Sequence, residues 1–344
     1  MNLIIDGIIE KLQDNGGCTV YFNQILSFFQ KSHNTLSYLK YTDKNNINIF
    51  NGNISYPKER ALERWLDVDI HNHDENTVFH STHYRLPRNK KNIKIVTTVH
   101  DFTYELYRSG PSQWMHSWQK NRAIKKSDLV ICVSKNTADD LMKFCPISPD
   151  KIRVVYNGVS DAYYPLNQYE NGKNVVFIGA RGWYKNFTLA VKAISRTDDF
   201  TLQIVGGGAL SEDEIELLET FLPNRYNWLG RLTDDELNLV YNKAYCLLYP
   251  SSYEGFGIPV AEAMRAGCPV IAINTSSIPE VAGDAAILLD EPREELIEDA
   301  ILSLGDVAYR NNLVSRGITQ ANKFAWQKCY QDTLNVYLEL VTNE

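Results

Sequence analysis

The stretch 251–272 places two glutamates around a glycine-rich turn. Glu254 lies in the turn, and Glu262 lies in a helix that we expect to begin near Pro259 and to end at Gly267. Glycines in the turn leave backbone N–H groups open at a helix N-terminus, which is a ready site for phosphate. Two carboxylates beside a phosphate suit the hydroxyls of a sugar and a ribose, although acids at a helix start can also simply complement the helix dipole.

A second loop, 179–187, carries two cations in the sequence GARGWYKNF. Arg181 and Lys185 stand four residues apart between a predicted strand and a predicted helix. A guanidinium fork and an ammonium point charge both suit a diphosphate. A leaving diphosphate gains negative charge in the transition state, so fixed cations aimed at it would lower the barrier. Either cation alone would more often be a surface charge, and the glycines of this loop favour the phosphate interpretation.

Three further positions at the ends of predicted strands carry weaker signals. Arg231 and Leu232 follow NWLG, where backbone groups could read a nucleobase edge. The turn at 15–17 ends in Gly17 and could let a backbone approach phosphate, although two glycines are more often only a turn. His100 ends the apolar run KIVTTV, where a polar ring is out of keeping with the residues before it.

The stretch HSTHYRLP at 80–87 follows a short apolar run and is a candidate acceptor site. Its polar side chains could contact an acceptor through His80, Tyr84 and Arg85. Tyrosine and histidine at a strand end also often cap a core, so the acceptor assignment is only a suggestion.

A metal site is not expected, although two features could suggest one. The motif DVD at 67–69 has the form of a short metal-binding acidic motif, but it lies in a polar stretch without a strand to present it. Histidines cluster nearby at His71, His73, His80 and His83.

Alternating apolar runs and amphipathic segments indicate two doubly wound α/β domains. A stretch rich in Tyr and Asn at 156–174 reads as the linker between them, and the region 32–76 gives no clear pattern. The predicted parts are an N-terminal domain 1–160, a C-terminal domain 161–325, and a helix 326–344 that packs back on the N-terminal domain. We expect the two domains to face each other across a cleft, with ligands beyond the carboxyl ends of the strands.

Composition sets the broad class of this 344-residue chain. It is 44% hydrophobic and 22% charged, with six scattered cysteines, which is typical of a globular protein in a reducing compartment. The net charge of −7 is uneven, since residues 1–160 carry +5 and the rest −12. The acidic half argues against nucleic acid, and the basic half could face anionic lipid, a phosphorylated acceptor, or only water.

No basic leader and no apolar run of spanning length is apparent, so we expect a cytoplasmic protein. Any membrane association would be peripheral, at the inner face of the membrane through the basic N-terminal domain.

Two stretches, SSYEGFGIPVAEAMRAGCPVIA and SSIPEVAGDAAILLD, closely resemble the signature of the retaining glycosyltransferases of family 4. FIGARGWYKNF, VHD at 99–101, SDLVICVSKNTADDL and RVVYNGV support the resemblance. It implies the GT-B fold, two Rossmann-like domains facing across a cleft, and a metal-independent hexosyltransferase of polysaccharide biosynthesis. The spacing from Arg181 to Lys185 is one residue shorter than in many members.

The resemblance also implies roles for the matched positions. The residues expected to act on the sugar and the diphosphate are Glu254, His100, Lys185 and Arg181. The residues expected to contact the rest of the donor are Gly17, Arg231, Leu232, Phe256, Gly257, Ile258 and Glu262, with Glu262 at the ribose.

The function we expect is transfer of a hexose, with retention, from a nucleotide-diphosphate-sugar to a glycan or lipid-linked glycan. A UDP-sugar is favoured over GDP-mannose, and no cofactor is expected. The alternatives are a silent sugar-nucleotide-binding protein and a GT-B epimerase or phosphorylase. A nicotinamide oxidoreductase is disfavoured, because the glycines of IVGGGAL lack the GxGxxG spacing.

Overall fold

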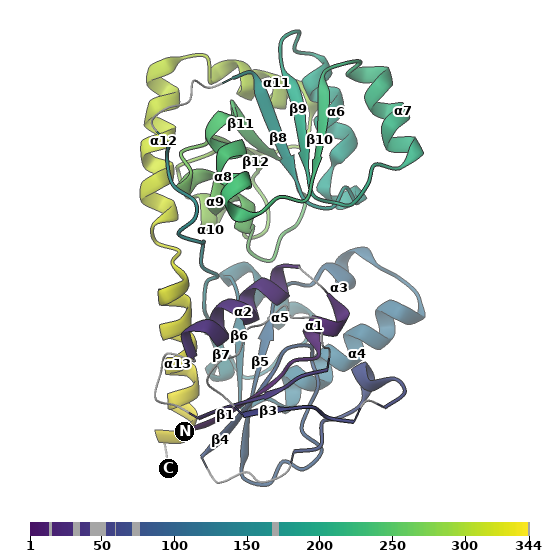
Figure 1. The fold of residues 1–344 in the computed structure, drawn as a ribbon, viewed down its shortest axis with the longest axis vertical. Helices are drawn as coiled ribbons and strands as arrows, with labels where there is room; N and C mark the ends of the chain where they lie inside the picture. The colour runs from purple at the N-terminus through teal and green to yellow at the C-terminus, as the bar shows by residue number, and fades with distance from the viewer. Residues whose placement is uncertain are drawn as a thin grey trace. The chain divides into compact units, whose positions relative to one another are not determined.

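A computed structural model describes residues 1–13, 16–29, 35–41, 53–58, 60–70, 76–166 and 172–342. The chain forms two compact units (Figure 1), and each has its own sheet and core. Unit 1 comprises Met1–Gly158 with Trp326–Glu344, and unit 2 comprises Val159–Ala325. The chain therefore passes between the units twice, after Gly158 and after Ala325.

Unit 1 is built on a seven-stranded sheet in the order β3-β2-β1-β4-β5-β6-β7, in which neighbouring strands are parallel. Its apolar, β-branched strands are buried, as expected where helices cover a parallel sheet. The strands are β1 (Asn2–Asp6), β2 (Thr35–Leu39), β3 (Asn53–Ser55), β4 (Thr77–Ser81), β5 (Ile93–Val99), β6 (Leu129–Cys132) and β7 (Ile152–Val154).

The helices of unit 1 include one from the far end of the chain. They are α1 (Ile9–Leu12), α2 (Gly17–Phe29), α3 (Thr103–Tyr107), α4 (Pro111–Lys126), α5 (Lys135–Phe144) and α13 (Trp326–Thr342), with short 3-10 turns η1 (Glu63–Trp65) and η2 (Pro149–Lys151). α13 packs beside α2, and both contribute to the main core of this unit. Tyr337 on α13 is fully buried, and its hydroxyl is hydrogen-bonded to His80 Nδ1 at 2.5 Å.

Unit 2 repeats the scheme with a six-stranded sheet in the order β10-β9-β8-β11-β12-β13, again with parallel pairs. The strands are β8 (Asn174–Ile178), β9 (Thr201–Val205), β10 (Tyr226–Gly230), β11 (Cys246–Tyr249), β12 (Val270–Ile273) and β13 (Ile287–Leu289). The helical segments are η3 (Trp183–Lys185), α6 (Phe187–Ser195), α7 (Glu212–Phe221), α8 (Asp234–Lys243), α9 (Ile258–Arg265), α10 (Ile278–Ala282), α11 (Glu294–Ser303) and α12 (Val307–Ala321).

The strand order of unit 2 reverses direction between β8 and β11. Chain order runs outward from β8 through β9 to β10, then returns to place β11 on the other side of β8. Val176 pairs with Leu247 across this junction, so the carboxyl ends of the two strands lie together. The loops that leave such a switch point diverge to opposite faces and open a crevice, where ligands of doubly wound sheets bind.

Some elements lie in regions for which no helix or strand was predicted. The region 32–76 contains β2, β3 and η1, and the region 294–321 contains α11 and α12. β3 is only three residues long and reads NIS, so it lacks the apolar alternation that identifies a strand.

Replacing Tyr337 by alanine should strongly destabilise unit 1. The variant removes a fully buried ring and leaves His80 Nδ1 without this hydrogen bond, which should lower the free energy of unfolding by about 3–5 kcal/mol. Tyr337→Phe should cost only about 1 kcal/mol, because the ring remains. Urea unfolding of the full chain measures both, with the partly exposed Leu338→Ala as control. Equal losses for Tyr337→Ala and Leu338→Ala would contradict the assigned packing.

Candidate functional site

The loops that leave β8 and β11 are joined by an ion pair. Lys185 Nζ contacts Glu254 Oε1, and it also donates to the Tyr249 hydroxyl at 3.2 Å. Both side chains of the ion pair are mostly buried, and the lysine ammonium lies 5.1 Å from the centre of the Tyr249 ring. Burial raises the pKa of Tyr249 well above its usual range, and the charge of Glu254 acts in the same direction. The phenol therefore stays protonated while the lysine and glutamate face each other.

Asn186 links the two loops beside this ion pair. Its backbone adopts a left-handed conformation with φ of 54°, which asparagine tolerates better than most residues. Its side-chain amide donates to the Pro250 carbonyl and to Ser252 Oγ, both at 2.8 Å. The Ser252 N–H donates in turn to the Tyr184 carbonyl at 2.8 Å. These bonds fix the backbone that carries Lys185 relative to the backbone that carries Glu254.

Glu254 is also held through its own main chain. Its N–H donates to Ser276 Oγ at 2.9 Å, and its carbonyl accepts from Ser277 Oγ at 2.9 Å. Both serines lie in the loop after β12, so three neighbouring strand ends contribute to one constellation. The carboxylate of Glu254 thus has a defined position before any ligand arrives.

Gly257 shapes the backbone at the start of α9. Its φ of 91° favours glycine, and a Cβ at this position would lie 2.6 Å from Ile278 Cδ1. The ring of Phe256 is buried against Phe324 at a centroid distance of 5.4 Å, while Ile258 is the first residue of α9. The N-terminal amides of this eight-residue helix therefore begin directly after the loop of Glu254.

Arg181, which is expected to contact a diphosphate, has several partners within unit 2. Its guanidinium is bound to Glu214 Oε1 at 2.8 Å and to the carbonyls of a glycine loop at 2.8–3.2 Å. Gly206, Gly207 and Gly208 all have positive φ, which turns their carbonyls toward the arginine. The side chain is only 3% exposed, so its donors are already committed within the protein.

The carboxyl group of Glu262 lies among other polar groups of unit 2. Burial raises its pKa to about 8, and the charge of Asp234 adds to the effect. The Tyr241 hydroxyl donates to Glu262 Oε2 at 3.4 Å, and Tyr163 donates to Asp234 Oδ1 at 3.2 Å. Although its carboxyl group is buried, the residue as a whole is partly exposed. A hydroxyl that donates a hydrogen bond to the Glu262 carboxyl group would favour the ionised carboxylate.

Arg231 and Leu232 lie where expected along the chain, between β10 and α8. Arg231 is exposed and Leu232 partly so. Thr233 caps α8, and its hydroxyl and the carboxylate of Glu236 form a reciprocal capping box. The predicted role of Arg231 and Leu232 at the nucleobase stays a prediction.

Two expected donor residues belong to unit 1. Gly17 is the first residue of α2, is exposed, and has open space where a Cβ would stand. His100 follows β5 and packs edge-on against Tyr21 at 5.1 Å. Burial lowers the pKa of His100 to about 4, and Nε2 is buried without a hydrogen-bond partner. At neutral pH this ring is therefore an uncharged hydrogen-bonding group.

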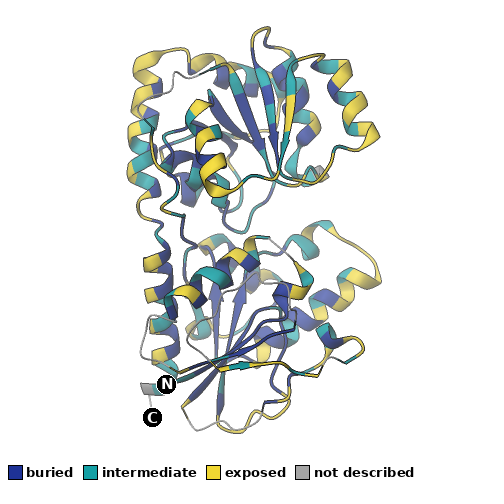
Figure 2. Cartoon of the chain, viewed as in Figure 1, coloured by how far each residue is buried: buried dark blue, intermediate teal, exposed yellow. Residues whose placement is uncertain are grey.

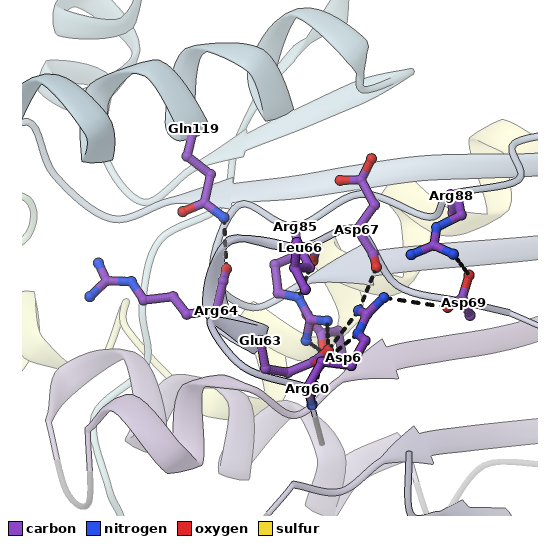
Figure 3. A network of polar contacts seen from close by, with 10 residues as sticks. All are labelled: Asp6, Arg60, Glu63, Arg64, Leu66, Asp67, Asp69, Arg85, Arg88 and Gln119. Carbon is purple, nitrogen blue, oxygen red and sulfur yellow. Dashed lines mark hydrogen bonds and ion pairs between the residues drawn. The ribbon is translucent and has the colours of Figure 1, made fainter. Parts of the chain in front are cut away.

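The side chains expected to contact an acceptor, those of His80, Tyr84 and Arg85, are all buried in unit 1. Arg85 bridges Asp6, at 3.0 Å, and Glu63 inside unit 1 (Figure 3). His80 is hydrogen-bonded on both ring nitrogens, and burial lowers its pKa to about 3.

The acids of the DVD motif form ion pairs with arginines. Asp67 accepts two hydrogen bonds from Arg122 at 2.8 and 2.5 Å, and Asp69 pairs with Arg88 at 3.1 Å and with Arg60 at 3.4 Å. His71 and His73 lie outside the described residues. Within the described ranges, His, Cys, Asp and Glu form no group of three that could hold a metal ion.

The sequence reasoning missed Tyr249, Asn186, Ser276 and Ser277. Each follows or ends a strand at the same edge of the sheet, which is the signal that could have identified them. Their partners lie between 22 and 66 residues away in the chain, so no local motif marks them.

None of the helices in the described ranges is long and apolar enough to cross a membrane.

Family models match most of the chain. Residues 165–319 match the model of the group 1 glycosyl transferases, and residues 43–163 match that of glycosyltransferase family 4. The two matches lie almost wholly in unit 2 and unit 1, respectively.

Individual proteins show the same similarity. O-antigen chain mannosyltransferase B of Escherichia coli is 29% identical over 286 residues, 76% of this chain and 74% of that protein. O-antigen chain mannosyltransferase RfbU of Salmonella typhimurium is 30% identical over 247 residues, 69% of this chain and 68% of that protein. The solved sucrose-phosphate synthase of Thermosynechococcus elongatus has a TM-score of 0.78 at 16% identity, with both chains fully covered.

The raised pKa of Glu262 predicts a pH dependence of stability. The folded pKa of about 8 exceeds the unfolded value, so this group's contribution is full below the unfolded pKa and is lost as pH rises toward 8. Between about pH 5 and pH 8, wild type should therefore lose stability relative to Glu262→Gln. Urea unfolding at both pH values measures the difference. Parallel pH curves for the two proteins would show that the Glu262 carboxyl titrates normally.

Proposed function

Because this chain belongs to the family 4 glycosyltransferases, with the GT-B fold and a place in polysaccharide biosynthesis, we propose that it transfers a mannosyl residue with retention. The donor is GDP-mannose, and the acceptor is a hydroxyl of a growing glycan. Mannose is favoured over the UDP-linked sugars expected from the sequence because the two relatives above are named as O-antigen mannosyltransferases.

The Lys185–Glu254 ion pair is the observation that carries the proposed chemistry. It lies at the switch point of unit 2, where the loops after β8 and β11 emerge together. The ammonium of Lys185 binds the donor diphosphate and stabilises the charge that develops as the sugar departs. Glu254 fixes the lysine in the absence of donor, and it accepts hydrogen bonds from hydroxyls of the sugar when the phosphates take over the ammonium.

The start of α9 supplies the rest of the phosphate site. The amides of Phe256, Gly257 and Ile258 stand at a helix N-terminus, where N–H groups and the helix dipole favour an anion. Together with Lys185 they provide positive charge of the kind that a divalent ion provides in other transferases. We therefore propose that transfer needs no metal ion and no cofactor.

Arg181 acts as a positioning residue rather than as a diphosphate ligand. Its guanidinium donates hydrogen bonds to the carbonyls of residues 206–209, which follow β9, and forms an ion pair with Glu214. It thereby holds the glycine loop beside the loop of Lys185. The ribose is assigned to Glu262, whose carboxylate accepts from the hydroxyls, and the base to Arg231 and Leu232.

Retention follows from which group accepts the acceptor proton. Glu254 is engaged by Lys185 through its carboxylate and by two serines through its main chain, so it is poorly placed to attack the sugar as a nucleophile. A departing phosphate oxygen on the same face of the sugar removes the proton from the incoming hydroxyl. The new bond then forms on the face from which the diphosphate leaves.

Lys185→Ala and Glu254→Ala should each abolish transfer while leaving the fold intact. The first removes the cation at the leaving group, and the second removes the sugar contact and the partner that orients the lysine. Rates should fall by roughly a hundredfold or more, as expected for loss of a transition-state charge contact. A donor-turnover assay measures this, with Lys173→Ala as control because Lys173 forms an exposed ion pair away from the site. Near-normal turnover by either site variant would count decisively against these roles.

The donor and the stereochemistry can be tested together on the purified chain. GDP-mannose should raise the thermal midpoint more than UDP-glucose or UDP-galactose, because a ligand at about 100 times its dissociation constant stabilises by ~2.7 kcal/mol. NMR of the product should show an α-linked mannoside from the α-linked donor, unchanged by a chelator. Preference for a UDP-sugar would refute the mannosyl assignment, and a β-linked product would refute retention. Loss of turnover with chelator would refute metal independence.

A further inference from the structure

The helix α4 of unit 1 exposes two tryptophans on one face. Trp114 and Trp118 are four residues apart, so they lie on the same side of the helix, and they are 68% and 52% exposed. Met115, next to them, is 41% exposed. Single exposed apolar residues are ordinary, but a contiguous group of large ones marks a contact surface. α4 lies at the edge of unit 1, and Figure 2 shows exposed residues along it.

The opposite face of α4 fixes where these rings stand. Lys120 is buried, donates to Glu105 at 2.5 Å, and lies 4.1 Å from the centre of the Phe102 ring. Ala123 and Ile124 are fully buried as well. The helix is thus firmly packed on the sheet side, and the tryptophans are held outward by a rigid element.

Cations follow the exposed rings along the helix. The 16 residues of α4 contain no Asp or Glu, and the exposed Lys125 and Lys126 lie in its last turn. Arg122 lies 5.7 Å from the Trp118 ring, although its guanidinium also pairs with Asp67. Partial burial, and then the charges of Lys126 and Arg122, lower the pKa of Lys90.

A hollow of about 380 Å³ lies on this face, lined by both tryptophans and by Gln113, Asn121 and Lys125. We define the α4 face as Trp114, Met115, Trp118, Arg122, Lys125 and Lys126. Apolar rings at one end and cations at the other form the pattern of a surface that lies in a bilayer interface.

We propose that the α4 face docks unit 1 on a membrane that contains anionic phospholipid. Trp114, Met115 and Trp118 enter the interfacial layer, and Lys125 and Lys126 meet the lipid phosphates. The contact is peripheral, and its strength depends on both the acidic lipid and the ionic strength. This inference does not rest on the proposed mannosyl transfer, since membrane binding is measured without donor.

Vesicle co-sedimentation of the full chain tests the proposal. Wild type should bind vesicles with about one third phosphatidylglycerol at low salt, and should bind pure phosphatidylcholine at least tenfold less. Trp114→Ala with Trp118→Ala, and Lys125→Glu with Lys126→Glu, should each reduce binding about tenfold or more. Their thermal midpoints should match wild type, because the replaced side chains are exposed.

Matched controls separate the α4 face from general stickiness. Trp228→Ala removes an exposed tryptophan of unit 2, and Lys323→Glu with Lys328→Glu reverses two exposed charges elsewhere, so these variants should bind as wild type does. Wild-type binding by the double tryptophan variant, or equal binding to both lipid compositions, would overturn the proposal. Binding of a soluble mannan at Trp114 and Trp118, with no vesicle binding, would assign the face to glycan and overturn it too.

Discussion

The contact between Lys185 and Glu254 is the interaction on which the donor site depends. It joins the ends of two strands that are neighbours in the sheet but lie far apart in the chain. A lysine and a glutamate that are only 12% and 14% exposed stabilise each other, because each charge has lost part of its hydration. The site therefore exists before the donor binds. In the proposed reaction, the donor diphosphate replaces the Glu254 carboxylate as the anion at the Lys185 ammonium.

Charge in unit 1 serves structure instead. Arg85 is fully buried and forms ion pairs with Asp6 and Glu63, while Arg122 and Arg88 form ion pairs with the acids of the DVD motif. These ion pairs fasten the segment 60–70, which has little regular structure, to the sheet and to α4. A buried network of this kind is sensitive to loss of any member, since the remaining charges would be unpaired. Lys125 and Lys126, by contrast, are exposed at the end of α4.

Much of the fold could be predicted because parallel strands are long apolar runs with polar helices between them. The runs at β5, β6, β8, β9 and β11 show this pattern, and so does the glycine turn before α9. β2 and β3 could not be predicted, since TLSYL and NIS carry polar residues and are recognisable only when paired with β1. The two helices α11 and α12 were not predicted, although Asp306 caps the start of α12 and Glu294 and Glu295 open α11.

The site was predictable in its loops but not in its contacts. Arg181 and Lys185 lie in the same loop and are both positively charged, yet only Lys185 contacts Glu254. Arg181 instead donates to backbone carbonyls of the loop after β9, where three glycines have positive φ. This contact depends on backbone conformation 25 residues or more away, which sequence spacing does not encode. Arg85 is a similar case. It follows β4 in the chain, and its guanidinium pairs with the buried acids Asp6 and Glu63.

A crystal structure of the chain with a bound nucleoside diphosphate tests the central claim most directly. The account predicts that the β-phosphate lies within hydrogen-bonding distance of Lys185 Nζ and of the amides at the start of α9, with Arg181 still bound to Glu214. A diphosphate bound elsewhere, with the Lys185–Glu254 contact undisturbed, would contradict it.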